Sequence, residues 1–141
     1  MSEIIYQEAL LRLAASADGA GRLAAPDATA RRDNPLCGDE VTLELQLRGG
    51  RVQALAHRVR GCLLCRASAA ALARGAAGRS AAELGEVHAR LAAMLRTGGP
   101  PPEGPFAELS AFLPVREVAS RQECVLLPFE ALEDALRQAG G

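Results

Sequence analysis

The amino-acid sequence predicts an α+β fold in which a small antiparallel β-sheet of about three strands packs against several helices. Apolar and polar residues alternate over residues 41–47, which is the period of a half-buried strand. A glycine-rich turn at residues 48–51 and a second extended segment at residues 52–59 follow, so the sheet is a β-hairpin or a three-stranded meander. Alanine- and leucine-rich segments that precede and follow the sheet in the sequence supply the helices.

Length, charge and aromatic content limit the function classes. A chain of 141 residues has the size of one domain, and we expect residues 1–141 to form a single domain that folds without needing a metal or disulfides. The net charge is −1, and only three Phe and one Tyr are aromatic. With no basic stripe for phosphates and little aromatic surface for bases, we expect no nucleic-acid partner.

The sequence also predicts the cellular compartment. Residues 1–8 contain no basic region ahead of an apolar stretch, and no uncharged apolar run approaches about 18 residues. We therefore expect a soluble, cytoplasmic protein with no membrane partner. Thiols stay reduced in the cytosol, so the four cysteines are interpreted as metal ligands, sulfur carriers or small buried apolar residues rather than as disulfides.

Two segments precede the predicted sheet. Ser2 is a helix-capping residue, and we expect a helix from there to about Ala15 that covers one face of the part of the chain that follows it. Residues 17–33 have no periodicity and are predicted to be a surface loop that leads to the turn around Cys37.

A helix is predicted directly after the sheet. Cys62 lies where the last strand gives way to this helix, which we expect over residues 67–77. The free N–H groups and the positive end of the helix dipole at such a junction lower the pKa of a thiol. Ser68 and Ala69 are small enough for a neighbouring element to approach this helix closely.

The remainder of the chain is divided by capping residues, glycines and prolines. Ser80 and Glu83 form a capping box that begins a second helix, through about Arg96. Four further segments follow: a rigid linker at 97–105, a short helix at 106–113, a connector at 114–120 and a final helix at 125–139. Cys124 is then expected at the start of the final helix.

One carboxylate and three thiols form the candidate site. Asp39 follows Cys37 by two residues, with Gly38 between them to let the backbone turn. Together with Cys62 and Cys124 they offer three soft ligands and one hard one, enough for tetrahedral zinc or for one edge of an iron–sulfur cluster. These wide separations match no short metal-binding motif, so inert buried cysteines remain an alternative.

Other chemistry receives less support from the sequence. Cys62 and Cys65 form a C-x-x-C pair, which is typical of thiol–disulfide redox proteins, but an antiparallel hairpin precedes it rather than a βαβ unit. Cys65, in an apolar run, is also interpreted as a packed residue. His57 and His88 are interpreted as partly exposed structural residues rather than ligands. The sequence has no Ser-His-Asp set, paired carboxylates or Gly-rich phosphate loop, which leaves sulfur chemistry.

Three segments resemble a known family. They are Asn34-Pro35-Leu36-Cys37-Gly38-Asp39, then Gly61-Cys62 with Arg66-Ala67-Ser68-Ala69, and finally the stretch from Arg121 to Phe129. In this order they resemble the U-type iron–sulfur cluster assembly proteins, namely IscU, SufU and the NifU N-terminal domain, over roughly Ile4 to Leu136. The long stretch between the last two cysteine segments, and an arginine three residues before the last cysteine, resemble the SufU branch more closely than IscU.

The resemblance implies a SufE/NifU-like architecture and a specific site. It implies that Cys37, Asp39, Cys62 and Cys124 bind zinc, iron or a [2Fe-2S] cluster. Gly38 and Arg121 support this site, and Cys124 is the implied acceptor of persulfide sulfur. The implied partners are a SufS-like cysteine desulfurase and recipient apoproteins or downstream carriers. Two roles stay open, a non-enzymatic scaffold and a zinc-dependent sulfurtransferase. Thiol–disulfide exchange at the C-x-x-C pair is the alternative function.

Overall fold

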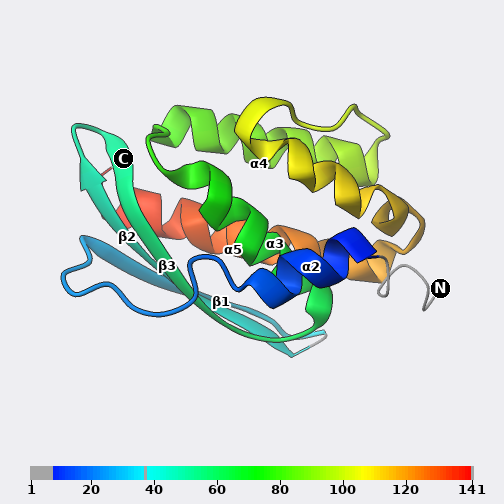
Figure 1. Ribbon diagram of the computed structural model, residues 1–141, viewed down its shortest axis with the longest axis horizontal. Helices are drawn as coiled ribbons and strands as arrows, with labels where there is room; N and C mark the ends of the chain where they lie inside the picture. Colours follow the sequence, from blue (N-terminus) through cyan, green and yellow to red (C-terminus); the bar gives the residue numbers. More distant parts are fainter. Residues whose placement is uncertain (1–7, 37, 141) are drawn as a thin grey trace.

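The computed structural model describes residues 8–36 and 38–140. Within these residues it contains a three-stranded antiparallel sheet, a long 3₁₀ helix and four α-helices (Figure 1). The strands are β1 Ala28–Asn34, β2 Asp39–Arg48 and β3 Arg51–Arg60. The helices are α2 Glu8–Ser16, α3 Leu63–Ala76, α4 Ala81–Arg96, η1 Gly104–Glu117 and α5 Ala119–Gln138. The predicted α+β class is confirmed.

The sheet is a meander with β2 in the centre. Its strand order is β1-β2-β3, and Leu43 of β2 pairs with Ala30 on one side and with His57 on the other. Val41, Leu43 and Leu45 alternate along β2 and are completely buried, which confirms the half-buried strand expected from their spacing. Gly49 and Gly50 both have positive φ in the tight turn that leads to β3, a conformation that glycine adopts without steric cost.

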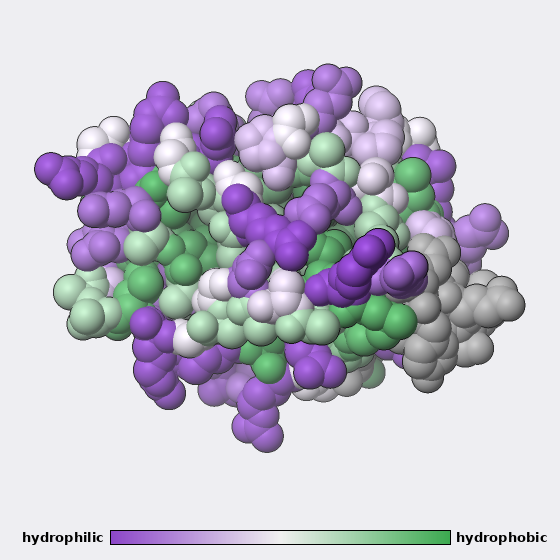
Figure 2. All heavy atoms as spheres, in the orientation of Figure 1, coloured by the Kyte–Doolittle hydropathy of each residue, from purple (hydrophilic) through white to green (hydrophobic). Residues whose placement is uncertain are grey.

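Helices cover one face of the sheet in two layers (Figure 1). Helix α5 packs against β1 and β2, and α3 packs against β3, α2 and α5. Helix α4 and η1 lie outside these and pack against each other, with α4 also against α5 and η1 against α3. One hydrophobic cluster runs through all of these contacts. Seen from the side of α2 and α4, hydrophilic side chains spread across the surface, with hydrophobic ones gathered between them (Figure 2).

The predicted elements on either side of the sheet are largely confirmed. The described part of the first helix ends at Ser16, one residue beyond the expected end, whereas its predicted cap Ser2 lies outside the described residues. Helix α3 begins at Leu63, four residues earlier than expected. The capping box before α4 is present, because Ser80 Oγ accepts the Glu83 N–H at 3.2 Å and Glu83 Oε1 accepts the Ser80 N–H at 2.9 Å.

The prediction of a loop over residues 17–33 is wrong at its C-terminal end, where β1 forms. Apart from Thr29, this strand has no β-branched or aromatic residue of the kind that usually marks strands, so its intrinsic propensity is low. Tertiary contacts form it instead. It pairs along its length with β2, and Arg32 crosses to α5 to donate to Asp134 at 2.7 Å.

The predicted boundaries near the C-terminus are also wrong. Residues 114–120 are not a connector, because η1 continues to Glu117 and α5 begins at Ala119. The segment from Ala119 to Cys124 contains no proline or glycine and can continue a helix. The Gln122 side chain fixes its position by donating to the carbonyl oxygens of Leu95 and Arg116. Cys124 consequently lies in the second turn of α5, not at its start.

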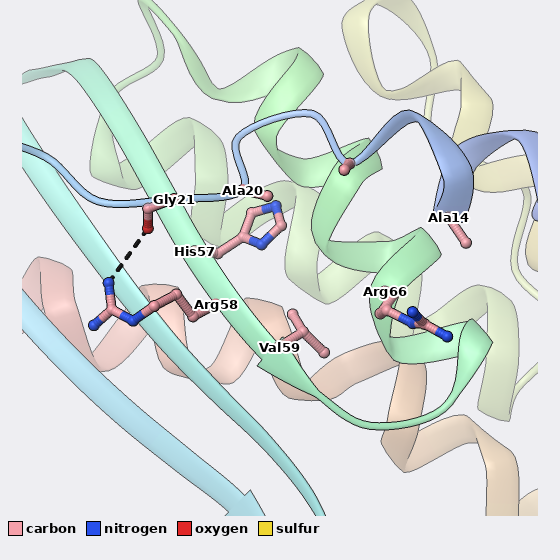
Figure 3. Close-up of a pocket in the computed structure, with 8 residues that line it drawn as sticks. Ala14, Ala20, Gly21, His57, Arg58, Val59 and Arg66 are labelled. Atoms are coloured by element: carbon pink, nitrogen blue, oxygen red, sulfur yellow. Dashed lines mark hydrogen bonds between the residues drawn. The ribbon is translucent and has the colours of Figure 1, made fainter.

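His57 has a structural contact, as expected, but it is buried rather than partly exposed. It is 4% exposed on β3, and its Nε2 lies 2.7 Å from the Asp18 carbonyl oxygen in the loop after α2. It also forms part of the wall of a surface hollow of about 300 Å³ between this loop, β3 and α3 (Figure 3). Burial lowers the pKa of His57 below its usual 6.5, because the interior disfavours the imidazolium.

The buried imidazole makes stability depend on pH. Below about pH 6.5 the unfolded chain binds a proton at residue 57 that the folded chain resists, so the free energy of unfolding falls as the pH drops from 7 to 5. We expect the His57→Gln variant to lose less stability over this range than the wild type. Urea unfolding of both metal-free proteins at pH 7, 6 and 5 measures the difference. Equal losses in the two proteins would contradict this assignment.

Candidate metal centre

Asp39 is held at the start of the central strand β2 by a tight turn. It is the first residue of β2 and faces Asn34, the last residue of β1. The turn closes as the Gly38 N–H donates to the Asn34 carbonyl oxygen at 2.8 Å and the Leu36 N–H donates to Asn34 Oδ1 at 3.0 Å. Gly38 has a φ of +77°, which confirms the need for glycine there. Asp39 is 4% exposed, so its carboxylate is buried at this end of the sheet.

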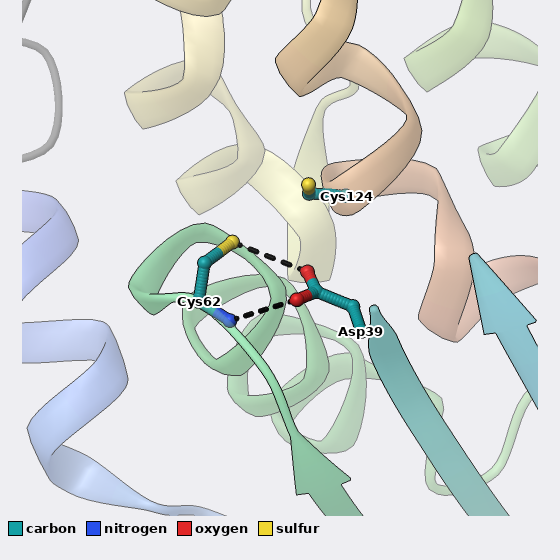
Figure 4. A group of neighbouring side chains, drawn as sticks. All are labelled: Asp39, Cys62 and Cys124. Carbon is teal, nitrogen blue, oxygen red and sulfur yellow. Dashed lines mark hydrogen bonds between the residues drawn. The ribbon is translucent and has the colours of Figure 1, made fainter. Parts of the chain in front are cut away.

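Cys62 caps the N-terminus of α3, where the sequence placed it. Its backbone N–H donates to Asp39 Oδ1 at 3.1 Å, and its thiol donates to Asp39 Oδ2 at 3.3 Å (Figure 4). The carboxylate therefore satisfies one of the free N–H groups at the start of the helix and also holds the cysteine side chain. These two hydrogen bonds hold together residues from two separate elements.

Cys124 completes the cluster from α5. Its side chain lies across from Asp39 and Cys62 (Figure 4), and one ligand atom from each of the three lies within 4.8 Å of the others. Cys124 is fully buried. Among the residues that the structure describes, this is the group of three or more His, Cys, Asp or Glu side chains that converges closely enough to hold an ion. Three of the four residues that the sequence singled out therefore meet in space.

The arrangement changes the acidity of Cys62. A hydrogen bond from the Cys124 thiol stabilises the Cys62 thiolate most strongly, and this lowers the pKa of Cys62 to about 7. The Cys65 backbone N–H acts in the same direction, whereas burial and the Asp39 carboxylate favour the protonated thiol. The predicted fall in pKa is confirmed, but its main cause is the neighbouring thiol rather than the end of the helix.

A glycine that sequence analysis did not assign to the site makes room for Asp39. A β-carbon built on Gly61 would lie 2.6 Å from Asp39 Cγ and 2.7 Å from Oδ1. Atoms cannot approach this closely, so any side chain at residue 61 would push the carboxylate away from Cys62. The Gly-Cys pair in the sequence could have indicated this position, because glycine permits close approach of other groups to the backbone.

Cys124 is reached through a surface hollow. The hollow has a volume of about 600 Å³, and Leu36, Arg121 and Glu123 line it together with Cys124. Leu36 is 92% exposed, which is unusual for a large apolar side chain. The negative charge of Glu123 is paired, because Arg96 Nη2 lies 2.7 Å from its carboxylate. Within the described ranges Arg121 has no carboxylate at salt-bridge distance.

Two of the sequence-predicted cysteines have different outcomes. Cys37, a predicted ligand in the turn before Asp39, lies outside the described residues. Cys65 is 0% exposed and belongs to the hydrophobic core, as its interpretation as a packed residue expects. In a C-x-x-C redox pair at least one sulfur is usually exposed to the substrate. Here Cys62 is half-buried and Cys65 is buried, so a substrate could reach only Cys62.

Comparison with known proteins assigns the family. The NifU-like N terminal domain matches residues 5–108, which is most of the chain. The chain belongs to this family. The matched part of this NifU-like domain contains Asp39 and Cys62 and ends before Cys124, so it is the fold that brings the third residue to the site.

Individual relatives agree with the family. The iron-sulfur cluster assembly scaffold protein IscU of Thermotoga maritima is 28% identical over 138 residues, covering 96% of this chain and 95% of that protein. The crystal structure of a nitrogen-fixing NifU-like protein (N-terminal) from Brucella abortus is 39% identical, with a TM-score of 0.94, and the match covers 99% of this chain and 96% of that chain.

A further crystal structure resembles this NifU-like domain. It is a putative iron-sulfur cluster assembly scaffold protein for the SUF system from Fervidobacterium islandicum, 26% identical over 96% of this chain and 99% of that chain, with a TM-score of 0.87. The predicted resemblance to U-type proteins and the predicted NifU-like architecture are confirmed. In the described ranges no helix combines the length and apolar character that crossing a bilayer requires.

Proposed function

We propose that this protein is an iron–sulfur cluster assembly protein that holds a metal or a nascent cluster at the rim of its sheet. The observation that carries the proposal is the convergence of Asp39, Cys62 and Cys124 from β2, α3 and α5. Cys37, which precedes Asp39 by two residues in the sequence, is proposed as the fourth ligand. The proposed ligand set is therefore three thiolates and one carboxylate.

The three described donors suit such a centre. Thiolates bind zinc at about 2.3 Å and carboxylates at about 2.0–2.2 Å, so the ligand atoms of a tetrahedral site stand slightly under 4 Å apart. The described ligand atoms lie within 4.8 Å of each other, so small side-chain rotations bring them to this spacing. When bound, a metal would keep the thiols deprotonated and protected from oxidation. The same donors suit iron of a [2Fe-2S] cluster as cargo.

Sulfur would reach the site by transfer from a cysteine desulfurase to Cys124. The Cys124 thiolate attacks the terminal sulfur of the donor's cysteine persulfide, and a new S–S bond forms at Cys124 as the S–S bond in the donor breaks. The donor's cysteine leaves as a thiolate, so no external oxidant or reductant is needed. The hollow lined by Leu36 and Arg121 gives the donor a route to this buried sulfur, and the Arg121 charge favours an anionic persulfide.

The finer assignments belong to this proposal. We propose a SufS-like desulfurase as donor, and recipient apoproteins or downstream carriers as acceptors of the product. The position of the chain on the SufU branch, its cytoplasmic location and the extent of the single domain over residues 1–141 are proposals of the same kind. If zinc is the resident metal the protein acts as a sulfurtransferase, and if iron and sulfide accumulate it acts as a scaffold.

Metal analysis after strictly anaerobic, reducing purification tests the function. We expect zinc or iron near one atom per chain, or two iron atoms per chain when a [2Fe-2S] cluster is assembled with a desulfurase, cysteine and ferrous iron. Absence of metal together with a reversible Cys62–Cys65 disulfide would instead favour the thiol–disulfide alternative. Absence of metal with unreactive thiols would overturn both.

A further inference from the structure

Helix α5 is joined to α3 by one buried side-chain hydrogen bond next to Cys124. Ser68, in the second turn of α3, is 0% exposed, and its Oγ donates to the Val125 carbonyl oxygen at 2.5 Å. Val125 directly follows Cys124 in α5. Cys62 caps the same helix that carries Ser68. This hydrogen bond therefore connects α5, one residue after Cys124, with the helix that Cys62 precedes.

The packing around Ser68 is suited to a close contact between helices. Its neighbours in the sequence, Ala67, Ala69 and Ala70, are all completely buried, so only small side chains border Ser68 along the chain. Small residues allow two helix backbones to approach until a serine hydroxyl can reach a carbonyl of the other helix. A carbonyl oxygen has two lone pairs, so Val125 accepts this bond in addition to a helical one.

The helical ladder of α5 lacks one hydrogen bond directly after Cys124. Pro128 lies inside the helix, and because proline has no backbone N–H it removes one bond from the helical ladder in this turn. On the other side of Cys124, Gln122 donates to Leu95 and Arg116, the last turns of α4 and η1. The turn that carries the cysteine is thus positioned by side chains on both sides of it.

We propose that Ser68 is a positioning residue that sets where Cys124 stands relative to Cys62 and Asp39. It touches neither a metal nor a substrate and acts only through the Val125 carbonyl oxygen. This inference rests on the proposed metal site, and it assigns the geometry of that site to a serine with no ligating role. Loss of the hydroxyl leaves α5 free to shift by a fraction of the spacing between the ligand atoms.

The test compares Ser68→Ala with two matched variants. Ser68→Thr keeps the hydroxyl. Leu10→Val removes one methylene from a completely buried side chain of α2, a helix that packs against α3 and η1, and it lowers stability without removing a bond to α5. Binding of Co²⁺ to the metal-free proteins is followed by the thiolate charge-transfer and ligand-field bands. We expect about tenfold weaker binding with altered bands for Ser68→Ala, the effect usual for residues that orient ligands.

A second measurement needs no metal. In a Cys37→Ser, Cys65→Ala background, where Cys62 and Cys124 are the two remaining cysteines, glutathione disulfide oxidises them to a disulfide and is itself reduced to two glutathione thiols. The equilibrium constant reports how close the two sulfur atoms stand, and we expect it to fall about tenfold in Ser68→Ala. Ser68→Thr and Leu10→Val should remain within about threefold of the wild type in both measurements.

The outcomes separate this inference from the proposed function. If Ser68→Ala matches Leu10→Val in the disulfide equilibrium and in Co²⁺ binding, Ser68 has no positioning role and the inference is wrong. If the wild type takes up no Co²⁺, the proposed metal site is wrong, and the disulfide equilibrium alone then decides whether Ser68 positions Cys124.

Discussion

Replacing Cys124 by serine is expected to lower persulfide formation on this protein at least about 100-fold when a cysteine desulfurase and cysteine are supplied. A hydroxyl with its very high pKa is not a nucleophile towards a persulfide sulfur at neutral pH, whereas a thiolate is. Serine also occupies nearly the same space in the fully buried position, so the fold is retained. Transfer of labelled sulfur from the desulfurase, quantified by mass spectrometry of the intact chain, measures the effect.

A matched control is available within the same chain. Cys65 is fully buried in the hydrophobic core, so a Cys65→Ala variant removes a thiol without touching the hollow at Cys124. We expect this variant to accept sulfur at a rate within about threefold of the wild type. If Cys124→Ser forms persulfide on Cys62 at the wild-type rate, Cys62 is the acceptor. Any other persulfide formation by Cys124→Ser at the wild-type rate would also refute the proposed transfer to Cys124.

Replacing Gly61 by alanine is expected to lower metal affinity about 100-fold. The added β-carbon would lie 2.6 Å from Asp39 Cγ, so the carboxylate must move out of its place. Asp39 then loses its hydrogen bonds to the Cys62 backbone and thiol, and the site loses both a ligand and the group that orients another. Competition for Zn²⁺ or Co²⁺ against a chelator of known affinity gives the change.

Gly85 provides the control for this substitution. It lies in α4, and a β-carbon built there meets no atom within 4 Å. Gly85→Ala should raise the free energy of unfolding by about 0.5–1 kcal/mol, because alanine favours helix formation, and should leave metal affinity unchanged. If Gly61→Ala binds metal as tightly as Gly85→Ala, the cavity around Asp39 adapts and the proposed steric role of Gly61 is wrong.

The fold was predictable where local patterns agree with tertiary structure. Alternation along β2 and the capping box at Ser80 are local signals, and both elements form as expected. Strand β1 was not predicted because its own sequence has a low strand propensity. Pairing with β2 and ion pairs with other elements stabilise it instead. The early start of α5 escaped prediction because a buried glutamine holds its first turn from outside.

The site was predictable in a different way. Spacing along the chain could not decide whether Asp39, Cys62 and Cys124 converge, since contacts between distant segments depend on how the elements pack. Resemblance to the U-type proteins supplied that choice, and the three-dimensional cluster agrees with it. Gly61 and Ser68 were not identified as site residues, because neither carries chemistry of its own and their roles are visible only as distances to Asp39 and Val125.

The three described donors belong to the sheet, to the first helix after it and to the last helix of the chain. An ion shared among them would act as a cross-link between parts that are far apart in sequence, and its binding free energy would add to the cooperativity of unfolding. Local opening of the C-terminal helix already exposes many buried side chains, and with an ion bound it would also require breaking a coordination bond. Under the proposed function, release of the bound ion or cluster would therefore be coupled to loosening of that helix.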